Sequence, residues 1–220
     1  MNFKNRSQGF TLVELLVTMT IIAVLASVVF LVAKRSINRA QQAVCVTNLG
    51  YIGQAIQTYA HEHGGRLPGP LYNGQSAVVG PPRNLATFIG EYLEVPGQPV
   101  NSKIVIQNFG CPAWKKKITS KTPEEAICYQ IGSTLKLANG RTVNPWTYPK
   151  PWGTAQPEPP SRLDEFDPVL AAKTMALVEQ DAQLANAWGT NSGPVVPPHG
   201  NQRTTLYFDW SVKSDPVPAK

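Results

Sequence analysis

The residue with the greatest chemical consequence is Glu14, a carboxylate near the start of a long apolar run. The run extends from Phe10 to Ala33 and holds no other charged side chain. About 20 apolar residues suffice for a helix to cross a bilayer, so this run is long enough to span one. An ionised carboxylate inside hydrocarbon costs a few kcal/mol, and we therefore expect Glu14 to have a cationic partner.

A histidine and an aspartate near the carboxyl end form a second pair that could do chemistry. His199 is followed by nine residues and then by Asp209. An imidazole and a carboxylate can bind a metal ion or form an ion pair. The sequence favours a structural role, in which Asp209 caps a hairpin turn and His199 hydrogen-bonds it or a backbone carbonyl. Calcium would need about six to eight oxygen ligands, and no compact group of acids provides them.

No enzyme motif stands out in the rest of the chain. The sequence has no Gly-x-Ser-x-Gly, no zinc-type cysteine and histidine spacing and no phosphate loop. We therefore expect no catalytic residue, no metal and no cofactor. His61 and His63 are two residues apart, which places them on different faces of a helix. The net charge of +6 falls to +4 without residues 1–9, and Lys115-Lys116-Lys117 is typical of a solvated turn, so we expect no nucleic-acid partner.

The apolar run that contains Glu14 is predicted to be the first half of a longer helix. No proline occurs between Lys34 and Glu62, and His63-Gly64-Gly65 is a strong helix stop. The second half of this predicted helix carries a single apolar stripe at helical spacing, made of Cys45, Leu49, Ile52, Ile56 and Tyr59. The opposite, polar face is expected to hold Gln41, Asn48, Gln54 and Gln57.

The remaining sequence predicts a small β-sheet against this helix. Strands are expected near residues 103–109, 128–137, 174–178 and 204–213, with hairpin turns at Asn139-Gly140 and Asp209-Trp210. Loops are expected at 64–83 and 144–160. We also expect a short helix capped by Asn84 and a tail that begins at Asp215. The predicted fold class is therefore α+β, with one long helix packed on a small antiparallel sheet.

The amino-terminal residues also resemble a known signature. Lys4-x-Arg6-x-x-Gly9-Phe10-Thr11-Leu12-x-Glu14 is similar to the start of type IV pilins and of the pseudopilins of type II secretion. The resemblance implies that prepilin peptidase cuts after Gly9 and methylates Phe10. It also implies that Glu14 faces the amino terminus of a neighbouring subunit in a filament. Helix rise places Glu14 about 6 Å along the axis from a new terminus at Phe10.

The same resemblance implies a topology and a set of partners. Residues 1–9 would be a leader, 10–33 the membrane-spanning half of the helix, and 34–220 a head in the periplasm or on a filament. The chain would cross the bacterial inner membrane once, in contact with lipid, an assembly platform and other pilin-like subunits. Basic residues flank the span on both sides, so charge does not fix the orientation. An ordinary signal peptide cut after Ala26 and a plain single-span anchor remain alternatives, although the run exceeds a signal-peptide core.

A second resemblance covers more of the chain. The spacing of His199 and Asp209 is similar to a histidine, nine residues, Asp-Gly motif in pilin-like proteins common in planctomycetes and their relatives. Further matching segments are Cys45-x-x-Asn48-Leu49-x-x-Ile52-Gly53, Gly64-Gly65-Arg66-Leu67-Pro68, Phe109-x-Cys111-Pro112 and the run that ends at Asp181. Trp210 stands where that group has glycine, so a turn with positive φ is harder to form there.

Three cysteines could form one disulfide in an oxidising compartment. Cys45 lies on the predicted apolar stripe, and Cys111 precedes the rigid Pro112 at the end of a predicted strand. The sequence favours a Cys45–Cys111 bridge, while pairings with Cys128 and three free thiols remain open. The leading function is a structural pilin-like subunit. The alternative is a monomeric, membrane-anchored binding module that uses a pilin-type signal.

Overall fold

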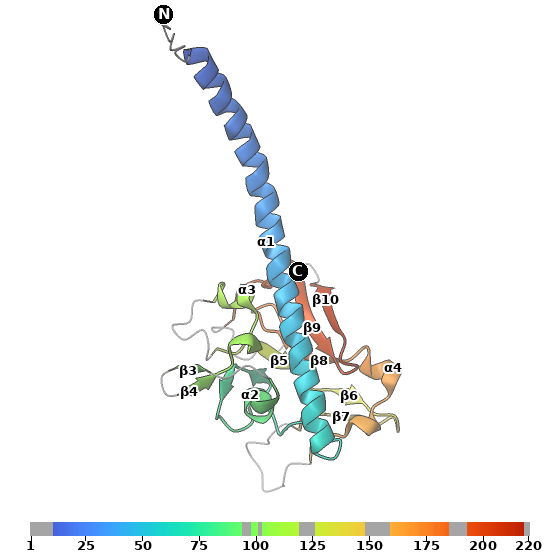
Figure 1. Cartoon of the computed structure of the whole chain (residues 1–220). Helices are drawn as coiled ribbons and strands as arrows, with labels where there is room; N and C mark the ends of the chain where they lie inside the picture. The colour runs from blue at the N-terminus through green and yellow to red at the C-terminus, as the bar shows by residue number, and fades with distance from the viewer. Residues whose placement is uncertain are drawn as a thin grey trace, which may run out of the picture. The chain divides into compact units, whose positions relative to one another are not determined.

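The computed structural model describes residues 11–93, 98–100, 103–118, 126–147, 159–184 and 193–217. The chain divides into two compact units, Met1–Ala40 and Gln41–Lys220. We call the second the globular unit. One long helix, α1 (Leu12–Glu62), begins in the first unit and ends in the globular unit (Figure 1). Together with the antiparallel sheets described below, it confirms the predicted α+β class.

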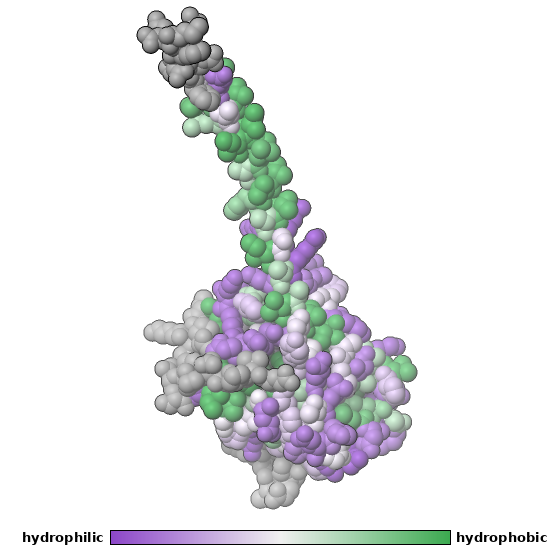
Figure 2. Space-filling view, in the orientation of Figure 1, coloured by the Kyte–Doolittle hydropathy of each residue, from purple (hydrophilic) through white to green (hydrophobic). Residues whose placement is uncertain are grey.

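The first half of α1 has the composition of a membrane span. Its described side chains are exposed from Leu12 to Ala40, and α1 is long and apolar enough to cross a bilayer. The face in Figure 2 is hydrophobic over most of this stretch, with hydrophilic residues near its two ends. The hydroxyls of Thr18, Thr20 and Ser27 donate to the carbonyls of Leu15, Val17 and Val24. These polar groups are therefore satisfied within the helix, as a segment surrounded by lipid requires.

The second half of α1 buries the predicted stripe. Cys45, Leu49, Ile52 and Ile56 are fully buried, and Tyr59 packs against the same core. Asn48 was predicted to be on the polar face, and that prediction is wrong. Its side chain is buried, and its Nδ2 donates to the carbonyl of Gly110 at 3.1 Å. A specific tertiary hydrogen bond thus compensates for burying this amide.

A five-stranded antiparallel sheet lies against this part of α1 (Figure 1). Its strand order is β1-β5-β8-β9-β10, and every pairing is antiparallel. The strands are β1 (Gly74–Gln75), β5 (Tyr129–Ile131), β8 (Met175–Glu179), β9 (Gln202–Tyr207) and β10 (Val212–Pro216). A Cβ added at Gly53 of α1 would lie 3.1 Å from Leu206 Cδ1 of β9. That glycine therefore permits the close approach of helix and sheet.

Smaller elements complete the globular unit. A three-stranded sheet has the order β2-β4-β3, and β6 pairs with β7. The strands are β2 (Val78–Val79), β3 (Gln98–Val100), β4 (Lys103–Val105), β6 (Leu135–Lys136) and β7 (Thr142–Val143). The short helices are α2 (Leu85–Ile89), η1 (Gly90–Tyr92), η2 (Gln107–Phe109), α3 (Pro112–Lys115), η3 (Leu163–Glu165) and α4 (Pro168–Ala171).

Several predicted boundaries need correction. The strand expected at 103–109 ends at Val105 and continues into η2. The segment 128–137 divides into β5 and β6, which belong to different sheets. The loop expected at 64–83 contains β1 and β2, and β10 extends into the predicted tail. Asn84 precedes α2, but its amide hydrogen-bonds Ser76 and Val78 and does not cap the helix.

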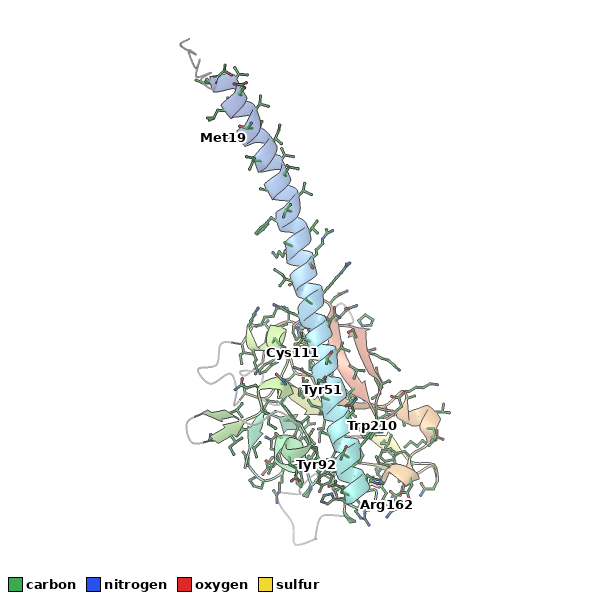
Figure 3. All side chains as sticks on the ribbon, viewed as in Figure 1. Met19, Tyr51, Tyr92, Cys111, Arg162 and Trp210 are labelled. Carbon is green, nitrogen blue, oxygen red and sulfur yellow. A yellow bond between two sulfur atoms is a disulfide. The ribbon has the colours of Figure 1, made fainter. Side chains whose placement is uncertain are left out.

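Both predicted hairpin turns form. β6 and β7 flank Asn139-Gly140, and β9 and β10 flank Asp209-Trp210. Trp210 adopts the left-handed conformation with φ 67°, so the turn keeps a positive φ without glycine. The Trp210 ring packs on the core beside Phe208 (Figure 3). We infer that this contact offsets the cost of the conformation. Trp146 of the proline-rich loop is fully buried, while Tyr148 and Trp152 lie outside the described residues.

Candidate functional site

Glu14 takes part in a reciprocal hydrogen-bond arrangement at the start of α1. The Thr11 backbone N–H and the Thr11 hydroxyl each donate to Glu14 Oε2 at 2.9 Å. The Glu14 N–H in turn donates to Thr11 Oγ1 at 3.2 Å. This is a capping box, Thr-x-x-Glu, which satisfies two amide groups that a helix start leaves free. The Thr-x-x-Glu pattern is visible in the sequence, and it adds a capping role to the intermolecular role expected of Glu14.

The capping box means that Glu14 does not depend on a cationic partner alone for its stabilisation. Two donors from Thr11 and the positive end of the helix dipole already stabilise the carboxylate. Glu14 forms no ion pair with another described residue. Its exposed carboxylate keeps the capacity to accept a further hydrogen bond. Gly9 and Phe10 themselves lie outside the described residues.

The second site is a buried cluster in the globular unit. Cys45 and Cys111 are joined by a disulfide with a Cα–Cα distance of 4.8 Å. His199 Nε2 lies 3.3 Å from Cys111 Sγ and 3.3 Å from Glu179 Oε1. The Glu179 side chain is fully buried, and the His199 side chain is only 4 % exposed. Two sulfurs, an imidazole and a carboxylate therefore meet where solvent has almost no access.

Four different elements position this cluster. Cys45 belongs to α1, and Cys111 is the residue before α3, where Pro112 at the first helical position restrains the backbone (Figure 3). Glu179 is the last residue of β8, and His199 precedes β9. The Thr204 N–H of β9 donates to Glu179 Oε2 at 2.9 Å. That bond leaves Glu179 Oε1 directed toward His199.

The third cysteine is separate from the bridge. Cys128 is a buried free thiol, and its Sγ–H points to the Gln75 carbonyl at 3.5 Å. Burial raises the pKa of Cys128 to about 12 because the charged thiolate loses its hydration. The thiol therefore stays protonated and unreactive at neutral pH.

His199 and Asp209 occupy different environments. Asp209 Oδ1 accepts hydrogen bonds from the Ser211 N–H at 3.0 Å and the Ser211 hydroxyl at 2.6 Å. These bonds close the β9–β10 turn, which is the capping role that the sequence favoured. His199 makes no hydrogen bond or ion pair with Asp209 in the described part of the chain; it contacts Cys111 and Glu179. Of the two histidines near the end of α1, His63 stacks its ring on that of Tyr59, with the ring centroids 3.8 Å apart.

A second buried acid, Asp181, follows Glu179 by two residues. Asp181 is fully buried and forms a two-point ion pair with Arg203 of β9, including Nη2 to Oδ1 at 2.9 Å. Glu179 was not predicted as a site residue either. Glu179 ends the buried strand β8 and Asp181 lies two residues beyond it, so the sequence signal was a buried apolar strand with two acids at its end.

Comparison with known proteins identifies the amino-terminal segment. Residues 4–30 match the family model of the prokaryotic N-terminal methylation motif. The chain thus carries a type IV pilin-like amino-terminal signal, which is typical of processed, membrane-anchored structural proteins. No curated protein and no solved structure matches the chain. The family match stops within the apolar half of α1 and does not extend to the globular unit.

Proposed function

We propose that this protein is a pilin-like structural subunit of a type II secretion or type IV pilus filament. Prepilin peptidase removes residues 1–9 and methylates Phe10, and the chain is held in the inner membrane by the first half of α1 until it assembles. The periplasmic or filament-exposed part is the globular unit. The observation that carries this proposal is the methylation motif over residues 4–30, which includes the cleavage junction.

The structure supports an assembly role for the apolar half of α1. In the isolated chain, side chains such as Leu16, Ile22 and Phe30 are exposed. Extraction from lipid would expose them to water at about 25 cal/mol per Å² of apolar surface. Lateral packing against the same segment of other subunits offsets this cost. An inner-membrane assembly platform would supply the extraction step.

Glu14 is the residue that we assign to subunit recognition. Cleavage after Gly9 creates an ammonium group at Phe10, directly before the capping box. In lipid, a carboxylate and an ammonium attract far more strongly than in water because the dielectric constant is low. The Glu14 carboxylate of one subunit can therefore pair with the amino terminus of its neighbour while Thr11 holds it in place.

Two substitutions separate this role from helix capping. Gln at position 14 keeps the acceptor of a capping box but removes the charge, whereas Ala removes both. We expect Glu14→Gln and Glu14→Ala to insert into the membrane normally and to abolish filament assembly in the native host. Thr18→Ala is the matched control, since it removes another polar group from the same segment, and it should assemble.

Sheared filament fractions and membrane fractions, compared by immunoblot, provide the measurement. Wild-type assembly by Glu14→Ala would exclude any assembly role. Wild-type assembly by Glu14→Gln together with failure of Glu14→Ala would assign Glu14 to capping and reject the charge pairing.

A further inference from the structure

One feature of the buried cluster is not explained by the disulfide. Glu179 Oε1 is buried and has no hydrogen-bond partner among the described residues, although it lies 3.3 Å from His199 Nε2. A buried carboxylate oxygen without a donor is costly. The same nitrogen also lies 3.3 Å from Cys111 Sγ. Oxygen, nitrogen and sulfur atoms thus converge on one small volume.

The donor set is one that binds zinc. One atom from each of Cys45, Cys111, Glu179 and His199 can act as a ligand, and all four lie within 4.8 Å of one another. Structural zinc sites are four-coordinate and tetrahedral, with Zn–S of about 2.3 Å and Zn–N and Zn–O of about 2.0–2.2 Å. Thiolate and imidazole ligands together favour zinc over magnesium or calcium, which prefer oxygen.

The distances agree with a tetrahedral arrangement. With those bond lengths, neighbouring ligand atoms are separated by about 3.4 Å for nitrogen and oxygen and about 3.5 Å for sulfur and nitrogen. The corresponding separations around His199 are both 3.3 Å. The two sulfurs must also separate, from a covalent bond to about 3.8 Å apart. The disulfide and the metal ion are therefore mutually exclusive.

Hydrogen bonds outside the cluster hold its ligands independently of the disulfide. The Thr204 N–H fixes Glu179 Oε2. Asn48 of α1 binds the carbonyl of Gly110, next to Cys111. Lys117 Nζ donates to the carbonyls of Pro197 and Pro198, directly before His199. Such outer contacts orient metal ligands and strengthen metal binding, and they explain why Asn48 is buried.

We propose that the reduced form of this protein binds one Zn²⁺ ion through Cys45, Cys111, Glu179 and His199. Reduction of the disulfide takes up two electrons and two protons and gives two thiols. With a phosphine as reductant, the electrons come from phosphorus, which becomes the phosphine oxide with oxygen from water. Zinc then displaces both thiol protons. The ion crosslinks α1, α3, β8 and the segment before β9, in place of the bridge that joins only α1 to α3.

The test uses the full chain in detergent, reduced by a phosphine without oxygen, with zinc or cobalt added alone. We expect about one zinc per reduced chain after desalting and none for the oxidised chain. Co²⁺ should give a sulfur-to-cobalt charge-transfer band and the strong visible bands of tetrahedral cobalt. Glu179→Gln should weaken zinc binding by about tenfold or more. Cys128→Ser is the matched control, because it removes the cysteine outside the cluster, and it should bind normally.

A second readout does not depend on the folding of any variant. Zinc should protect Cys45 and Cys111 of the reduced wild type from alkylation, as mapped by mass spectrometry. If the reduced chain stays folded without zinc, the labelling of the buried Cys128 should not change on zinc addition. Near-ultraviolet circular dichroism reports whether the reduced chain is folded, and zinc-dependent refolding would also support the site. The proposal is overturned if reduced wild type binds no more zinc than the Cys45→Ser/Cys111→Ser double variant.

Discussion

Loss of the Cys45–Cys111 crosslink should strongly destabilise the globular unit. The bridge closes a loop with a sequence separation of 66 residues. The chain-entropy relation gives such a loop about 4 kcal/mol at 25 °C through its effect on the unfolded chain. With a urea dependence of about 2 kcal/mol per M, the unfolding midpoint should fall by about 2 M on reduction.

Urea unfolding of the full chain in detergent measures this loss. The buried residues Trp114 and Trp146 provide the fluorescence signal, and a chelator keeps the reduced chain free of metal. Oxidised wild type, reduced wild type and Cys45→Ala/Cys111→Ala are compared. Cys128→Ala in the oxidised state is the control, since it deletes a buried sulfur but opens no loop. A midpoint shift on reduction below about 0.5 M, at the same urea dependence, would refute the loop-closure argument.

Two further predictions concern the globular unit. Gly132→Ala should destabilise it by about 3 kcal/mol or more, because the new Cβ would lie 1.8 Å from the first backbone carbonyl oxygen of β8. Gly50→Ala, where no atom lies within 4 Å, should instead stabilise α1 by about 1 kcal/mol. Asp181→Asn should cost about 3–5 kcal/mol because it leaves Arg203 partly buried without its counter-ion. Asp164→Asn, in an exposed pair, should produce no measurable loss. Thermal or urea unfolding of all four variants measures these changes. Equal effects of the two glycine variants, or of the two aspartate variants, would contradict the corresponding prediction.

The sequence predicted those parts of the fold that depend on local pattern. The stripe from Cys45 to Tyr59 follows helical spacing, and the turns at Asn139 and Asp209 follow from turn-forming residues between strands. Asn48 was misplaced because its burial depends on one carbonyl from residue 110. The division of segment 128–137 between two sheets could not be predicted, because the sheet that a strand joins depends on tertiary pairing.

The two sites differ in how much of each could be predicted from the sequence. The amino-terminal signal is contiguous, so its residues were predicted, although the capping role of Glu14 was overlooked. The buried cluster draws its four ligands from residues 45, 111, 179 and 199. No local spacing connects them, so no zinc-type pattern is visible in the sequence. His199 was singled out for its spacing from Asp209, but the fold brings it to Cys111 and Glu179.

The most direct test of the account is the amino terminus of the mature protein. We predict that intact-mass and terminal-peptide analysis of protein from the native host will show a chain that begins with N-methylated Phe10. Gly9→Val should retain the leader, whereas Ser7→Val, two residues earlier, should be processed normally. A mature chain that begins at Ser27, or one that keeps residues 1–9 in the wild type, would contradict the account.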